Sequence, residues 1–134
     1  MKTESDQPFA QLGYDIIGAA MAVYNDLGGG LSEEIYQESF EIELAERGFQ
    51  FVSQPELAVY YKGSPLKKRL RPDLIVESEI VIELKAVSAL IDEHRAQALN
   101  YLRVTRKQVG YLINFAAFPN IEWQRLVNTR LPKV

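Results

Sequence analysis

The fold is decided by the stretch RPDLIVESEIVIELK, residues 71–85. Two apolar runs, residues 74–76 and 80–82, flank a polar Glu77-Ser78-Glu79, which is typical of two antiparallel strands joined by a short loop. A three-residue loop pairs Val76 with Ile80 and thereby sets Asp73 opposite Glu83. Directly opposed residues on one face have Cβ atoms about 4.5–5.5 Å apart. The sequence therefore predicts two facing carboxylates at the end of an apolar hairpin.

A lysine completes this pattern. Lys85 lies two residues beyond Glu83, hence on the same face and roughly 7 Å along the strand. Like charges placed opposite each other destabilise a sheet, and the apolar neighbours imply burial. A shared divalent cation would remove the conflict, and Mg²⁺ (or Mn²⁺) suits a pair of carboxylates. Such a cation activates water and stabilises charge on a phosphate, with Lys85 as a further cation at the reacting centre.

A simpler interpretation of the same residues stays open. Glu83 and Lys85 could form a salt bridge on an exposed face, and Pro72-Asp73 could be only a turn. The register is the weakest point, because residues 77–79 lack the Gly that three-residue hairpin loops favour. A slip of one residue would place Asp73 and Glu83 on opposite faces of the sheet.

The rest of the chain predicts a mixed α/β arrangement. Apolar residues recur at helical spacing over residues 9–27, and a second helix is expected over 31–47, with Gly48 as its C-terminal cap. Residues 91–106 predict a third helix, whereas residues 121–127 fit either a strand or a short helix. Extended runs are expected at Phe51, 56–61, 66–76, 80–87 and 109–115. This order predicts a mixed sheet packed against helices.

Bulk composition narrows the class of protein. The chain has 134 residues, 47% of them hydrophobic and 25% charged, which is the composition of an ordinary globular domain. We expect one domain over residues 9–134, preceded by a frayed tail over residues 1–8. No cysteine is present, which excludes disulfides and cysteine-ligated zinc. No apolar run approaches the ~20 residues of a membrane helix, and no signal peptide is apparent. We therefore expect a cytoplasmic protein with no membrane partner.

Two helices supply further polar candidates. Gln97 and Tyr101 stand at i, i+4 on the third predicted helix, with His94 one turn earlier, although each alone could be an ordinary helix residue. Because His94 is the only histidine, no histidine cluster can bind metal. Glu33 lies in the first turn of the second predicted helix. From the residues alone, its favourable interaction with the helix dipole explains it better than a role at a metal.

Several motifs together carry a family resemblance. Gly30, Glu33 and Tyr36 spell GxxExxY, and they are followed in order by Pro72-Asp73, Glu83-Leu84-Lys85, QALNY at 97–101 and LINF at 112–115. Over residues 17–127 the chain closely resembles the GxxExxY protein family, a branch of the PD-(D/E)XK nuclease superfamily. The resemblance implies a restriction-endonuclease-like core, a mixed β-sheet flanked by helices in the order αβββαβ.

The resemblance also implies roles for residues. It assigns metal binding to Asp73 and Glu83, to the Leu84 carbonyl as a further ligand, and to Glu33 as a first-helix acid. Lys85 would orient the attacking water or stabilise the transition state, and Gln97 with Tyr101 would belong to the catalytic group. The implied cofactor is Mg²⁺ (or Mn²⁺), and the implied partner is nucleic acid, DNA rather than RNA.

Three functions are compatible with this sequence. The first is a metal-dependent nuclease that hydrolyses phosphodiester bonds in DNA. The second is a non-catalytic module that keeps the nuclease fold and acts as a homodimer or with a protein partner, which the net charge of −3 favours modestly. Basic residues Lys67, Lys68, Arg69 and Arg71 could touch phosphates or protect an edge strand. The third is an enzyme acting on another phosphate ester, such as a nucleotide.

Overall fold

The structure is a computed structural model that describes residues 7–130, so residues 1–6 of the expected N-terminal tail lie outside the described part. In these residues the predicted helices and strands are found with small shifts of their ends, except that the extended run expected over residues 66–76 is divided in two. The elements are α1 (Ala10–Leu27), α2 (Glu33–Glu46), β1 (Phe51–Ser53), β2 (Leu57–Tyr61), β3 (Ser64–Leu70), β4 (Leu74–Val76), β5 (Ile80–Lys85), α3 (Asp92–Thr105), β6 (Val109–Asn114) and β7 (Glu122–Val127).

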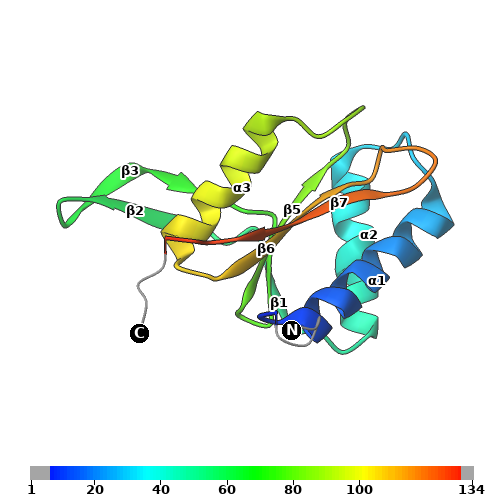
Figure 1. Ribbon diagram of the computed structural model, residues 1–134, viewed down its shortest axis with the longest axis horizontal. Coiled ribbons are helices and arrows are strands. Elements are labelled where there is room, and N and C mark those ends of the chain that lie inside the picture. Colours follow the sequence, from blue (N-terminus) through cyan, green and yellow to red (C-terminus); the bar gives the residue numbers. More distant parts are fainter. Residues whose placement is uncertain (1–6, 131–134) are drawn as a thin grey trace.

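Five strands form the central sheet, in the order β1-β4-β5-β6-β7. The pair β5–β6 is parallel and is connected through α3, whereas the other neighbours are antiparallel. Helices α1 and α2 lie together on one side of the sheet and α3 on the other (Figure 1). The expected αβββαβ order is met by α2, β1, β4, β5, α3 and β6. The undecided segment at 121–127 is the edge strand β7.

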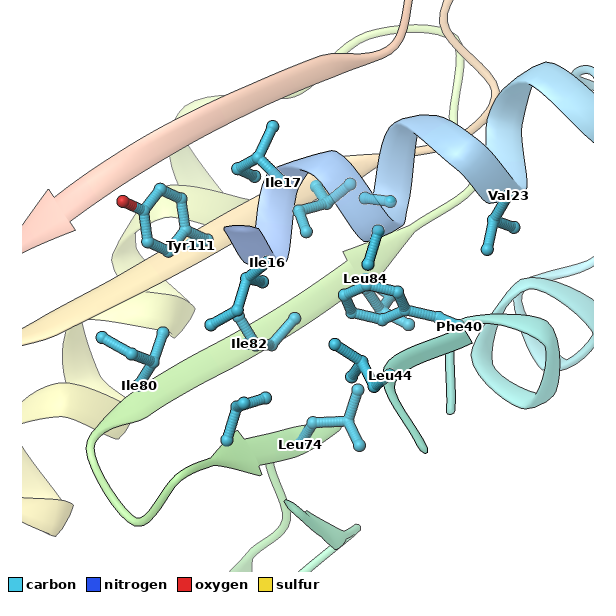
Figure 2. Packing of buried hydrophobic residues seen from close by; sticks show 14 of the residues in the cluster. Ile16, Ile17, Val23, Phe40, Leu44, Leu74, Ile80, Ile82, Leu84 and Tyr111 are labelled. Atoms are coloured by element: carbon cyan, nitrogen blue, oxygen red, sulfur yellow. The ribbon is translucent and has the colours of Figure 1, made fainter. Parts of the chain in front are cut away.

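The main core lies between the sheet and the α1–α2 pair. Residues 80, 82 and 84 of β5 point toward α1 and α2, as the alternation of a strand requires (Figure 2). Phe40 and Leu44 of α2 and Ile16 of α1 meet them and are fully buried. The period-2 pattern of β5 and the helical spacing of α1 thus produce one continuous apolar layer.

The loop between β4 and β5 shows how the hairpin keeps its register without glycine. Val76 pairs with Ile80, as predicted, while Glu77 and Ser78 take left-handed backbone conformations with φ of 53° and 59°. Such φ values are unfavourable for residues with a side chain. The turn is anchored from outside, because Glu77 accepts a hydrogen bond from Gln50 N and donates one to Gln50 O.

One predicted segment is divided in two. Residues 66–76 do not form a single extended run, because the chain leaves the strand conformation at Arg71 and Pro72. Consequently β2 and β3 form a separate two-stranded hairpin that projects beyond the central sheet (Figure 1). Lys67 and Lys68 lie on β3, which is an edge strand of this two-stranded sheet, so both interpretations of these residues, contact with phosphates and protection of an edge strand, stay open.

Candidate active site

Asp73 and Glu83 are placed by the β4–β5 hairpin. Leu74 pairs with Ile82, so Asp73, one residue earlier, stands opposite Glu83, one residue later. Val81 packs in the small cluster under α3, and Glu83 and Lys85 follow it at intervals of two residues on the same face. The predicted facing of the two carboxylates on one side of the sheet is thus present, with Lys85 beside them.

Two hydrogen bonds fix the carboxylates. Asp73 N donates to Glu83 Oε1 at 2.8 Å, and Leu84 N donates to Asp73 Oδ2 at 2.7 Å. The Glu83 carboxylate therefore accepts from the backbone of Asp73, and the Asp73 carboxylate accepts from the backbone next to Glu83. In an antiparallel pair the N–H and C=O of one residue point to the same neighbour, so the Leu84 carbonyl also faces the strand that leads to Asp73.

Burial gives this pair unusual electrostatics. The Glu83 side chain is only 4% exposed, and burial, followed by the nearby charge of Asp73, raises the pKa of Glu83 to about 8. Burial also raises the pKa of Asp73, with the charge of Glu33 acting in the same direction; the Leu84 N–H and the Lys85 ammonium oppose this increase. Near neutral pH the metal-free pair therefore retains a proton that two isolated carboxyls would have lost.

Lys85 is connected to α3 by a short polar chain. Lys85 Nζ donates to Gln97 Oε1 at 3.0 Å, and Gln97 Nε2 donates to the Tyr101 hydroxyl at 3.3 Å. The pKa of Tyr101 is raised by burial and then by the charges of Glu83 and Asp73. The predicted i, i+4 pair thus lies at the site, on the α3 side of the sheet.

The α2 side contributes a third acid and an amide. Glu33 lies in the first turn of α2 and lines an open groove of about 570 Å³ together with Asp73. Gln37, one turn further on, donates to Asp73 O at 2.9 Å. Gln37 was not predicted from the sequence, although its position four residues after Glu33 places it on the same helix face.

Tyr36 positions this helix. Its hydroxyl donates to Gly28 O and accepts from Leu31 N at 3.2 Å, and its ring stacks on Phe115 with centroids 4.8 Å apart. The side chain is fully buried. Tyr36 therefore ties the loop between α1 and α2 to the sheet, so that α2 begins at a fixed place beside Asp73.

Asn114 and His94 lie outside the group of acids. Asn114, fully buried at the end of β6, bonds both the N–H and the C=O of Val87 and also contacts Glu122. Asn114 thus fixes the backbone just after β5. A single amide within an apolar run is the sequence signal for it, because a buried amide needs hydrogen-bond partners. His94 Nδ1 accepts from Ile91 N at 3.1 Å and so caps the start of α3.

The donor atoms suit a hard divalent cation. Two carboxylates and a backbone carbonyl offer the oxygen ligands that magnesium and manganese prefer, and a cation would offset the like charges buried there. Among residues 7–130, no three His, Cys, Asp or Glu side chains already converge closely enough to hold a metal ion. The protein alone thus supplies two carboxylates, and magnesium sites of that kind complete their coordination with waters and substrate phosphate.

Comparisons with known proteins agree with this architecture. The chain matches a crystal structure of SSO0001 with a TM-score of 0.53 and 22% identity, covering 70% of this chain and 48% of that one, which shows a shared fold. The chain thus spans about half the length of that protein, and no curated protein matches. No helix in the described residues is long and apolar enough to cross a membrane. Residues 10–126 match the family model described as the PD-(D/E)XK nuclease superfamily, and the chain belongs to that superfamily.

Proposed function

We propose that this protein is a divalent-cation-dependent nuclease that hydrolyses phosphodiester bonds in DNA. The observation that carries the proposal is the reciprocal pair of hydrogen bonds that holds Asp73 and Glu83 face to face. Burying two like charges is costly, and a fold retains such a cost where function requires it. Membership of a superfamily named for nucleases supports phosphodiester hydrolysis as the reaction class.

In this proposal Asp73, Glu83 and the Leu84 carbonyl bind the cation, and Glu33 adds negative charge from the α2 side of the groove. Magnesium or manganese bound there supplies Lewis-acid stabilisation of a phosphate oxygen and activation of water. The Leu84 N–H keeps the Asp73 carboxylate in one orientation, and Asp73 N does the same for Glu83. The protein thus presents its ligands already arranged.

Lys85 acts on the phosphate side of the reaction. Its ammonium is held by Gln97 Oε1, so it stays near the acid pair instead of sampling many rotamers. A positioned cation stabilises the charge that develops on the phosphate in the transition state. Gln97 and Tyr101 are positioning residues, because their polar chain fixes Lys85 from α3.

Cation binding is the first test. Titration calorimetry with Mn²⁺ is expected to show binding that the double variant Asp73→Asn, Glu83→Gln loses. The matched control is Glu46→Gln, which removes an exposed carboxylate at the far end of α2 and leaves binding unchanged. Equal binding by the wild type and the double variant would place the cation elsewhere.

Cleavage of labelled single- and double-stranded DNA in Mg²⁺ or Mn²⁺ is the second test. Lys85→Ala is expected to lower the rate by about 100-fold or more, as loss of a transition-state contact does. Lys107→Ala, at a lysine beyond α3, is the control for a general loss of positive charge. Cleavage that persists at the wild-type rate in Asp73→Asn, Glu83→Gln contradicts the proposal.

A second candidate is a non-catalytic module with the same fold that binds a protein partner. The acidic character of α2 favours it, because six of its fourteen residues are glutamates and none is basic. Such a surface repels a polyanion. Absence of any DNA binding at low salt, together with absence of cation binding, would support this candidate over the nuclease.

A further inference from the structure

The β2–β3 hairpin has a charge opposite to that of the whole chain. Residues 57–70 hold Lys62, Lys67, Lys68 and Arg69 and no acidic residue, while the chain has a net charge of −3. Within residues 7–130, ion pairs are formed by Arg47, Arg71 and Arg95 and by none of these four. The four side chains are exposed, so their positive charge is available to a polyanion.

Two exposed tyrosines lie near the tip of the hairpin. The side chains of Tyr60 and Tyr61 are 64% and 63% exposed, and as neighbours in a strand they point to opposite faces. The Lys62 ammonium lies 5.5 Å from the centre of the Tyr61 ring, whereas among the described residues the Tyr60 ring has no aromatic or cationic partner. Tyr60 therefore offers an open aromatic surface.

Cross-strand pairing shows which cations share a face with Tyr60. Tyr60 pairs with Pro65 and Ala58 pairs with Arg69, so these four residues lie on one face of the ribbon. The register shifts between these two pairs, so residues 66–68 of β3 stand opposite Val59 alone in a bulge, and Lys67 lies within this bulge between Pro65 and Arg69. Leu70 packs in the cluster under α3, so the face that carries Tyr60 is turned away from that cluster.

The hairpin leads directly to the acid pair. Arg69 precedes Asp73 by four residues, so at most about 14 Å of chain separates their Cα atoms. On the other side of Asp73 lies α2, with its glutamates and with Gln37 bonded to Asp73 O. A polyanion near Asp73 is thus attracted from the hairpin side and repelled from the α2 side.

We propose that the Tyr60 face of the β2–β3 hairpin binds one single strand of DNA, with Lys67 and Arg69 on phosphates and Tyr60 stacked on a base. The choice of DNA rests on the proposed function. The choice of a single strand rests on Tyr60, because an aromatic ring stacks on a base that is free of its duplex partner. In duplex DNA the faces of the bases are already stacked on one another, so Tyr60 finds no base face to stack on.

The test is equilibrium binding of a fluorescent single-stranded oligonucleotide, followed by anisotropy in EDTA over a series of salt concentrations. Tyr60→Leu is expected to weaken binding about tenfold without changing the salt dependence. Lys67→Gln, Arg69→Gln is expected to weaken binding and to reduce the slope of log K against log salt by roughly 1.4, because each phosphate contact on a single strand contributes about 0.7.

Matched controls lie one residue away in the same strands. Tyr61→Leu removes the same side chain from the opposite face, and Lys68→Gln removes the lysine next to Lys67; each is expected to change affinity less than its partner variant. Melting curves verify that all variants are folded. Equal losses from Tyr60→Leu and Tyr61→Leu, or no loss from either, overturn the assignment of the face.

Binding of other polyanions is measured in the same way for comparison. Duplex DNA and single-stranded RNA of the same sequence are expected to bind more weakly than the DNA strand, and vesicles of anionic phospholipid are expected to lose no binding in Tyr60→Leu. Equal affinity for RNA or duplex, or a Tyr60 effect confined to vesicles, contradicts the proposal. If the protein cleaves DNA and the hairpin variants bind as the wild type does, the proposed role of the hairpin is refuted and the proposed nuclease function is not. If the hairpin variants lose binding but the wild type cleaves no DNA, the proposed nuclease function is refuted and the role of the hairpin is not.

Discussion

The two faces of the central sheet differ in what they bury. Under α1 and α2 lies a large apolar cluster in which Ile16, Phe40 and Leu84 are almost completely enclosed. Under α3 the buried cluster is small, consisting of Val81, Tyr101 and Leu102, and the same face continues into Glu83 and Lys85. One strand, β5, contributes to both faces through alternate residues.

This difference separates stability from chemistry within a single strand. The α1–α2 face gains free energy from apolar surface removed from water, at about 25 cal/mol per Å². The α3 face gives up part of that gain to hold two acids in a buried position. Substitutions on the first face should therefore act mainly on folding, and substitutions on the second mainly on binding and cleavage.

The largest effect on folding is expected at the apolar face. Phe40→Ala removes a fully buried ring that contacts Phe115 edge to face, and it should lower the free energy of unfolding by about 3–5 kcal/mol. Urea unfolding followed by circular dichroism measures it. Ile42→Ala, on the exposed side of the same helix, is the control and should cost far less. Similar losses from the two variants would mean that this face is not the main core.

On the opposite face, Glu83→Gln should stabilise the metal-free protein. The pKa of Glu83 rises from 4.5 to about 8 on folding, so its protonated form favours the fold; this stability is present below pH 4.5 and is lost as the pH rises through about 8. At pH 9 in EDTA the variant should gain about 1–3 kcal/mol over the wild type. Thermal melts at pH 4 and pH 9 measure the difference. A gain that does not depend on pH contradicts this origin.

Cation affinity should follow the same proton. Because Glu83 with its raised pKa must lose a proton to bind a cation, the apparent affinity for Mn²⁺ should rise with pH up to about 8, approaching tenfold per pH unit. Calorimetry in buffers of different ionisation enthalpy would detect the released proton. A flat profile between pH 6 and pH 8 would show that Glu83 does not bind the cation.

The smallest effect on folding, paired with a clear effect on cleavage, is expected at Gln97. Gln97→Ala removes an exposed side chain, so it should change the free energy of unfolding by only about 0.5 kcal/mol. It also releases Lys85, and cleavage should slow roughly tenfold. Asn100→Ala, also exposed and on the same helix, is the control. If both variants cleave at the wild-type rate, Gln97 does not position Lys85.

The same difference between the two faces explains which features of the structure could be predicted from the sequence. The register of β4 and β5 was predictable because a one-residue slip would expose Leu74 and Val76, so burial determined it. The separation of β2–β3 from the sheet was missed, although Pro72 and Asp73, residue types that are depleted in strands, mark a break within residues 66–76. The contacts of Gln37 and Asn114 were also missed, since each bonds to backbone atoms distant in the sequence.

The buried hydroxyl of Tyr36 has a consequence for how this chain can vary. It connects Gly28 O and Leu31 N, so the elbow between the first two helices has a fixed length. An insertion or deletion within residues 33–36 would rotate Glu33 by about 100° per residue relative to Tyr36 and carry it away from the groove. We therefore expect natural variation at this elbow to change residue types while the count between Gly28 and Tyr36 stays constant.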